Sequence, residues 1–256
     1  HDWTGWIPFE ELPARENPPE GFIVTANNPV AGDSYAHHLT GDWLADYRGR
    51  RIQQLLTEAT PLSLDDHRRI QTDTTSLMSR RFVALALPLV AEERLQAADA
   101  AWALDTLAAW DGDMAARQVA PSLCFAWQVF LTHAVIEQAV GPGMAGRLLK
   151  PGEDIGFPSM PFHEMAYELV LNWLENGGPD WVGDIRPLVG PARDKALVAL
   201  RQHYGADLDR WVWGNLHQIQ LEHQLSQLPG LGRLWKSTRR PAGGASFTVN
   251  QAEVSP

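Results

Sequence analysis

The 256-residue chain carries 21 basic and 31 acidic residues, so its formal net charge is −10. Nucleic acid is therefore not an expected partner, because binding a phosphate backbone requires clustered positive charge and the chain has no long Lys/Arg block. No uninterrupted apolar run reaches about 18 residues, and no charged and then apolar signal region opens the chain, so we also expect no membrane partner.

The first predicted element is a short strand over residues 21–26. Phe22 to Thr25 are aromatic or β-branched, and turn residues stand on both sides of them, at Gly21 and at Asn28-Pro29. A strand that ends here would present Asn27 at its edge, where the two amide N–H donors are suited to stabilising an oxyanion. The alternative interpretation is that Asn-Asn-Pro is only a turn.

Helical patterns begin at Asp42, and apolar residues follow at near-helical spacing as far as Leu56. Ser63, with Asp66 three positions later, predicts a capping box and therefore the start of a second helix. The helical pattern resumes over residues 82–90, where Pro88 should kink or divide the helix.

Four further helices are predicted, over residues 97–110, 121–139, 162–175 and 191–204. The helix over 121–139 is apolar around most of its circumference and so belongs in the interior. It contains the single cysteine, Cys124, whose apolar neighbours indicate a buried and inert thiol. Residues 151–161 form a predicted loop, and residues 247–249 form a predicted closing strand.

Three polar clusters suggest chemistry but have simpler explanations. Neighbouring His37 and His38 cannot readily share a metal ion, because adjacent side chains diverge on both strands and helices. His217 and His223 lack the i, i+4 spacing of helical metal ligands, so packing or hydrogen bonding is expected there. Capping accounts for the acidic residues of Asp65-Asp66-His67. Alone, the chain therefore has no nucleophile with a visible base.

Several short motifs, in this order, resemble the penicillin acylase (penicillin amidase) family of N-terminal nucleophile hydrolases, over nearly the whole chain. They are Trp3-Thr4-Gly5-Trp6-Ile7-Pro8-Phe9-Glu10, Asn17-Pro18 before Gly21-Phe22-Ile23, Asn27-Asn28, Tyr47-Arg48 with Arg51-Ile52, Ile70-Gln71-x-Asp73, Trp110-Asp111-Gly112, Trp213-Gly214-x-Leu216-His217 with His223, and Thr248-Val249-Asn250. A single short motif is weak evidence, whereas eight in the right order are strong.

The resemblance implies an α+β fold in which this chain is an interior part of the β chain. The whole fold would be an αββα sandwich, of which this segment supplies mostly helices and a few strands. Residues 1–41 would form a loop and strand segment that contributes to the sheet, residues 42–240 a mainly helical region, and residues 241–256 the truncated start of the following strand segment.

The resemblance also implies the reaction. An N-terminal Ser, or less often Thr or Cys, on another segment would attack the acyl carbon of an amide, with its own α-amino group as the general base, and form an acyl-enzyme. Asn27 would supply a side-chain N–H to the oxyanion hole, and Arg48 would hold the carbonyl oxygen of Asn27 and so orient the amide. Arg51 is expected to pair on the helix surface.

Partners and cofactors follow from the same resemblance. The substrate would be a small acyl amide of the β-lactam, acyl-homoserine lactone or lipopeptide type, and the partners would be the companion α chain and the remaining β-chain segments of one precursor. No cofactor is required for the chemistry, and structural calcium is allowed, with Asp42 near the relevant stretch. The resemblance also implies a periplasmic or extracellular location, as in other members of the family.

Two other classes of protein compete with this interpretation. One is a non-catalytic, mostly helical binding module that derives from such an enzyme. The other is a metal-dependent helical hydrolase, which would bind stoichiometric zinc, and we expect none. A companion segment that begins with Ser, Thr or Cys directly after a self-cleavage point would favour the acylase over both.

Overall fold

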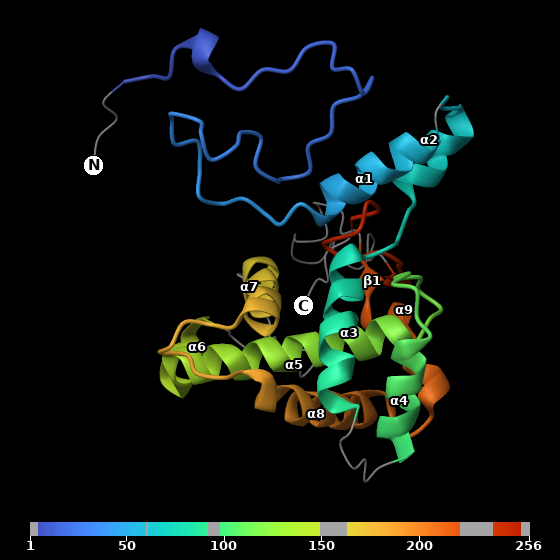
Figure 1. The fold of residues 1–256 in the computed structure, drawn as a ribbon. Helices are drawn as coiled ribbons and strands as arrows, with labels where there is room; N and C mark the ends of the chain where they lie inside the picture. The colour runs from blue at the N-terminus through green and yellow to red at the C-terminus, as the bar shows by residue number, and fades with distance from the viewer. Residues whose placement is uncertain (1–4, 60, 92–97, 149–162, 221–237, 252–256) are drawn as a thin grey trace, which may run out of the picture.

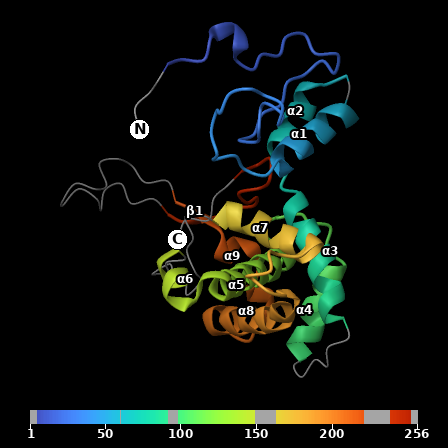
Figure 2. The ribbon, with the colours of Figure 1, turned by 60° about the vertical axis from the view of Figure 1, so that its left-hand side comes forward.

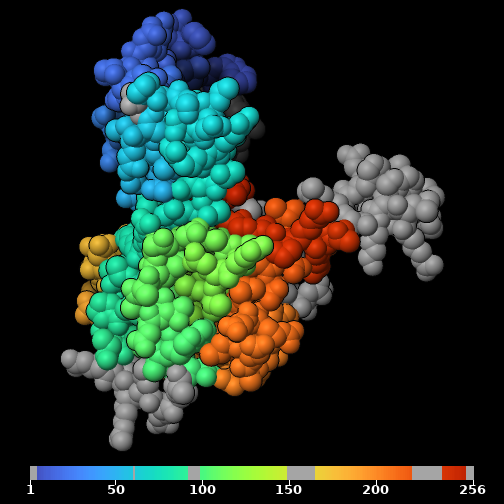
Figure 3. All heavy atoms as spheres, turned by 90° about the vertical axis from the view of Figure 1, so that its right-hand side faces the viewer, coloured from blue at the N-terminus to red at the C-terminus, as the bar shows by residue number. Residues whose placement is uncertain are grey.

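The structure is a computed structural model that describes residues 5–59, 61–91, 98–148, 163–220 and 238–251. It has an upper part, made of the N-terminal segment with helices α1 (Tyr47–Glu58) and α2 (Leu64–Gln71), and a lower bundle of helices (Figure 1). Seen from the side, the upper part stands on one end of the bundle (Figure 3). The fold is mostly helical, as predicted for this part of an α+β protein.

The N-terminal segment before α1 contains one short 3-10 helix, η1 (Phe9–Glu11), and is otherwise irregular. The strand predicted over residues 21–26 is wrong for this structure, because these residues join no hydrogen-bonded ladder with the other described residues. Side chains of this segment nevertheless alternate between more and less buried positions, as they would in a strand. Phe22, Val24 and Ala26 are more buried than the residues between them, of which Ile23 is 56% exposed.

Helix α1 begins at Tyr47, five residues after the predicted start at Asp42. The backbone before α1 is not helical. The N–H of Leu44 instead donates to the carbonyl of Asn27 over 2.9 Å. Helix α2 confirms the predicted capping box: the Ser63 hydroxyl accepts from the N–H of Asp66, and the Asp66 carboxylate accepts from the N–H of Ser63.

The bundle is arranged around helix α5 (Ala120–Val140), which contacts every other α-helix of the bundle. Helices α7, α5 and α8 lie in successive layers (Figure 2). The other bundle elements are α3 (Leu77–Val90), α4 (Ala98–Ala108), α6 (Pro142–Leu148), α7 (His163–Asn176), η2 (Arg186–Leu188), α8 (Val189–Tyr204), η3 (Leu208–Arg210) and α9 (Trp213–Leu216).

The bundle differs from the predicted pattern at two prolines. Helix α3 runs through Pro88 without division, although a proline inside a helix removes one backbone hydrogen bond. Gly141 ends α5 with a φ of 78°, as a glycine after a helix often does. The next residue, Pro142, then begins the unpredicted helix α6, because proline suits the first position of a helix. The loop predicted over residues 151–161 lies outside the described residues.

Helix α5 is the apolar core helix that the sequence predicts. It is long and apolar enough to span a membrane by length and composition, but half of that stretch is buried inside this protein. Trp127 is fully buried and donates its indole N–H to the carbonyl of Val189 at the start of α8, over 2.9 Å. Cys124 is also fully buried, and desolvation raises the pKa of its thiol to about 12. The prediction of a buried thiol is confirmed.

The described strands are β1 (Gln218–Ile219) and β2 (Arg240–Pro241), which pair antiparallel. The strand predicted over residues 247–249 is wrong, because the chain there makes a turn. The Thr248 hydroxyl donates to the carbonyls of Ala245 and Asn250, so local bonds replace a ladder. Phe247 is buried edge-on against the ring of Tyr47, which joins this C-terminal turn to α1.

Candidate active site

Residues 26–28 form a tight turn beside the start of α1. Asn27 has a φ of 64°, a left-handed conformation that asparagine tolerates better than most residues. Its backbone carbonyl accepts from the N–H of Leu44 over 2.9 Å, which ties the turn to the chain leading into α1. The side chain of Asn27 remains exposed. The alternative interpretation, a turn at Asn-Asn-Pro, agrees with the structure, whereas the predicted strand before it is absent.

Arg48, the second residue of α1, lies against this turn. Its Nη2 donates to the side-chain oxygen of Asn27 and, over 3.2 Å, to the backbone carbonyl of Ala26. The Nδ2 of Asn27 bonds to none of the residues that the structure describes. Because Arg48 occupies the amide oxygen, the amide N–H groups point away from the guanidinium and remain available to a ligand. The predicted contact is present, and the catalytic role of the pair stays a prediction.

Tyr47, the first residue of α1, anchors this helix to the bundle. Its hydroxyl donates to Glu168 of α7 over 2.6 Å and accepts from Arg81 of α3 over 2.7 Å, and Arg81 also pairs with Glu168 over 3.0 Å. Tyr47 is only 2% exposed, and this burial, with Glu168 as the acceptor, raises its pKa to about 12. The network thus fixes the residue next to Arg48.

Sequence reasoning missed this network, because 121 residues separate Tyr47 from Glu168 and no local motif links them. The only available signal was a tyrosine at the buried start of a helix. A buried phenol requires a hydrogen-bond partner, but the sequence does not say which residue it is.

Arg51 lies one turn further along α1 and makes a second anchor. Its Nε and Nη2 donate to the two carboxylate oxygens of Asp73, over 3.0 and 2.7 Å, and both side chains are only 13% exposed. Arg51 also donates to Gln54 on the surface of its own helix over 3.0 Å, as expected, but its principal partner is the residue two positions after α2. Since the backbone carbonyl of Asp73 also accepts from the N–H of Asn250, this anchor reaches the C-terminal turn.

The other polar candidates have structural roles. His37 pairs with Glu11 over 2.5 Å and joins two parts of the N-terminal segment. His217 is buried, stacks on the ring of Trp213 and bonds through Nδ1 to the carbonyl of Ala242 over 2.9 Å, which confirms the expected packing role. Its proposed companion, His223, lies outside the described residues.

A metal site does not fit the described residues. No three His, Cys, Asp or Glu side chains among them come close enough to share an ion. Asp42, the residue nearest to a calcium ligand in the resemblance, is exposed, and its backbone N–H bonds to the hydroxyl of Thr40. We therefore assign no calcium ligand among the residues that the structure describes and derive no step through a metal.

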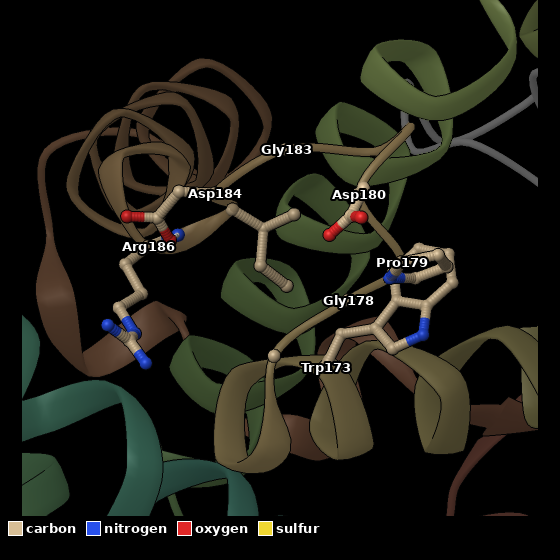
Figure 4. A pocket seen from close by; sticks show the side chains of 9 residues that line it. Trp173, Gly178, Pro179, Asp180, Gly183, Asp184 and Arg186 are labelled. Carbon is tan, nitrogen blue, oxygen red and sulfur yellow. Dashed lines mark hydrogen bonds between the residues drawn. The ribbon is translucent and has the colours of Figure 1, made fainter.

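A separate pocket of about 330 Å³ lies between the end of α7 and η2. Asp184 and Arg186 lie across it from Asp180 and Trp173 (Figure 4). The Asp184 carboxylate accepts from the backbone N–H of Arg186 and so shapes the loop. None of these residues belongs to the elements that hold Asn27, so the pocket is distinct from the turn of residues 26–28.

Comparison with known proteins gives a consistent result. All 256 residues match the penicillin amidase family. The chain is 32% identical to the penicillin acylase 2 proenzyme of a Pseudomonas species over an alignment of 256 positions, which covers 97% of this chain and 31% of that protein. It is 24% identical to the acyl-homoserine lactone acylase QuiP of Pseudomonas aeruginosa over an alignment of 274 positions, which covers 98% of this chain and 32% of that protein.

A solved structure shares the fold. The thermostable penicillin G acylase of Alcaligenes faecalis superposes with a TM-score of 0.56 and 22% sequence identity, over 82% of this chain and 41% of that one. The chain spans about a third of the length of the curated relatives that it matches. The order of motifs, the turn at Asn27 beside Arg48 and the match over the whole length agree: this chain belongs to the penicillin amidase family.

Proposed function

We propose that this chain supplies half of the oxyanion hole of an amidohydrolase that removes the acyl side chain of a small amide. The hydroxyl of an N-terminal Ser on another segment attacks the acyl carbon, and its proton passes to the α-amino group of the same residue. A new C–O bond forms, and the carbonyl oxygen becomes an oxyanion. The Nδ2 of Asn27 donates a hydrogen bond to that oxygen.

The reaction then completes in two steps. The C–N bond breaks, and the amine leaves with the proton held by the α-amino group. Water next attacks the acyl-enzyme while the α-amino group takes its proton, and a second oxyanion forms. The C–O bond to the serine then breaks, the carboxylic acid leaves, and the proton returns to the serine oxygen. The same donor serves both oxyanions, so a single asparagine acts in acylation and in deacylation.

The observation that carries this proposal is the hydrogen bond from Arg48 to the side-chain oxygen of Asn27. An exposed asparagine amide rotates freely in water and loses entropy when it orders around a transition state. Arg48 holds the amide in advance, with the N–H groups directed away from the protein. Donors that are oriented before the reaction stabilise developing charge most effectively.

The relatives support the choice of substrate class. One is named a penicillin acylase and another an acyl-homoserine lactone acylase, and both names describe the removal of an acyl group. We propose a β-lactam, acyl-homoserine lactone or lipopeptide amide as the substrate, and a periplasmic or extracellular site of action.

The proposal also requires further polypeptide around the N-terminal segment. Trp6 and Phe9 are 86% and 82% exposed, and Ile23 is 56% exposed. Large exposed side chains of this kind on one segment are typical of a surface that another chain covers. We propose that the companion α chain and the remaining β-chain segments of the same precursor cover it. A name of one relative, proenzyme, fits such processing.

A panel of amide substrates tests the function. The full-length protein that contains this chain is assayed with phenylacetyl, glutaryl and long-chain acyl amides, and the reaction is quenched early for mass spectrometry. We expect hydrolysis of at least one amide, and an acyl adduct on the segment that begins with Ser, Thr or Cys. No hydrolysis and no adduct, with tight binding of the same amides, would instead identify a binding module.

A further inference from the structure

We propose that Asn28, seated against Gly49, is a positioning residue that sets the direction of the Asn27 amide. The inference rests on the proposed function, because it assigns a role within the same oxyanion hole. Arg48 orients the side chain of Asn27. In this inference, Asn28 in addition fixes the backbone of Asn27.

The first observation is the bond that closes the turn. The Oδ1 of Asn28 accepts from the backbone N–H of Ala26 over 2.9 Å, so the bond spans Asn27. The Nδ2 of Asn28 donates to the carbonyl of Pro29 over 3.2 Å, which fixes the orientation of the amide. With both ends of this amide occupied, the backbone of Asn27 is held at its φ of 64°. A residue in this region relaxes toward negative φ when its support is removed.

The second observation is the close approach of Gly49. This glycine is buried in the first turn of α1, and a Cβ added to it would lie 3.1 Å from the Oδ1 of Asn28 and 3.5 Å from its Cγ. The distance of 3.1 Å is tighter than most real Cβ contacts, whereas 3.5 Å is an ordinary contact, so a side chain at position 49 pushes on the oxygen that accepts from Ala26. A glycine at this point therefore lets the asparagine amide rest directly on the helix.

Together, two successive residues of α1 hold three successive residues of the turn. Arg48 bonds to the carbonyl of Ala26 and to the side chain of Asn27, and Gly49 supports Asn28. The helix itself is fixed by Tyr47. A displacement of the Asn28 amide by a few tenths of an ångström is thus passed to the backbone that carries the proposed oxyanion donor.

This arrangement predicts an effect on the transition state alone. A donor that moves away from the oxyanion loses a bond that exists only after the nucleophile has attacked. Removing the acceptor of Asn28 should therefore lower kcat and leave KM nearly unchanged. Loss of folding, by contrast, would lower the concentration of active enzyme and the melting temperature together.

The experiment compares variants in the full-length enzyme. Asn28→Leu removes the acceptor and keeps the size of the side chain, Asn28→Asp keeps an acceptor oxygen, and Gly49→Ala pushes on it. A boronic acid that carries the acyl group reports on the tetrahedral state, and the carboxylic acid product reports on the ground state. Gly146→Ala is the matched control, because that helical glycine has no heavy atom within 4 Å of an added Cβ.

We expect Asn28→Leu and Gly49→Ala to lower kcat and the boronic acid affinity by roughly 10-fold to 100-fold, with KM and product affinity within about threefold of wild type. Asn28→Asp should recover most of the loss, and Gly146→Ala should show none. An unchanged kcat in Asn28→Leu overturns the inference, as does an equal loss of boronic acid and product affinity. If Asn28→Leu does not fold, Gly49→Ala decides by the same criteria.

The variant Asn27→Gly separates this inference from the proposed function. If Asn27→Gly keeps the wild-type kcat, the oxyanion role fails, and the inference fails with it. If Asn27→Gly loses activity while Asn28→Leu and Gly49→Ala do not, only the positioning role fails.

Discussion

The guanidinium of Arg48 and the side-chain amide of Asn27 are joined by a hydrogen bond across 21 residues of sequence. The arginine stands in the first turn of a helix, and the asparagine stands in a left-handed turn that the Asn28 side chain closes, so each backbone has support besides this bond. Their contact therefore orients an amide rather than holding the fold together. This distinction determines the predicted behaviour of variants at each position.

Arg48→Leu should lower kcat by at least about tenfold and leave the fold intact. Both acceptors of Arg48 lie in the turn of residues 26–28, and an ion or hydrogen-bond pair near the surface contributes only about 0–1 kcal/mol to stability. Steady-state kinetics and circular dichroism of the full-length enzyme check this. Arg50→Leu is the control, since Arg50 pairs with exposed Asp46 and does not bond to the turn. A loss of ellipticity in Arg48→Leu would make the residue structural.

Asp73→Asn should destabilise the protein by about 1–3 kcal/mol, because Arg51 loses a charged, bidentate partner at a site where it is only 13% exposed. We expect the melting temperature of Asp73→Asn to lie several degrees below that of the wild type. The matched control is Asp65→Asn, whose carboxylate is 86% exposed and pairs with Arg68 on the helix surface. Equal melting temperatures for the two variants would show that the buried pair adds nothing.

Tyr47→Phe tests the network under α1 through its dependence on pH. Burial, and then the bond to Glu168, raise the pKa of Tyr47 to about 12 from an ordinary value near 10. The stabilisation from the neutral phenol is thus complete below pH 10 and is lost as the pH rises to 12. The gap in unfolding free energy between wild type and Tyr47→Phe should narrow by roughly 2–3 kcal/mol over that range. A constant gap would mean that the phenol is not desolvated.

Gly244→Ala should lower the free energy of unfolding by more than the cost of placing an alanine at positive φ. Gly244 has a φ of 81°, and an added Cβ would lie 2.1 Å from the carbonyl oxygen of Asn250, so the backbone must move. Gly177→Ala is matched in φ, at 82°, but has open space around the added Cβ, and should cost only about 1 kcal/mol. Melting curves that show the same loss for both variants would contradict the close contact.

The sequence predicted the elements that local physics determines. The capping box of Ser63 and Asp66 and the all-apolar face of α5 were each evident, because their signals lie within a few residues. Asn27 and Arg48 were paired only through the family resemblance, since no local rule joins a turn to a helix 21 residues later. In the structure, Arg48 donates a hydrogen bond to the side-chain oxygen of Asn27.

The remaining features depend on contacts that a linear pattern does not reveal. A strand over residues 21–26 requires a neighbour, and β-propensity alone does not supply one. The anchors of Tyr47 and Arg51 join α1 to partners on other elements, and the close packing of Gly49 on Asn28 depends on two segments meeting. Each of these was decided by tertiary structure.

The oxyanion role of Asn27 is tested by kcat of the full-length enzyme that carries Asn27→Gly. This substitution keeps the left-handed backbone and removes the amide. Asn17→Ala serves as the control, because Asn17 is also exposed and also has a positive φ, at 46°. We predict a fall in kcat of roughly 10²–10³ for Asn27→Gly, with KM nearly unchanged, and wild-type kinetics for Asn17→Ala. A kcat for Asn27→Gly within threefold of wild type would contradict the oxyanion role.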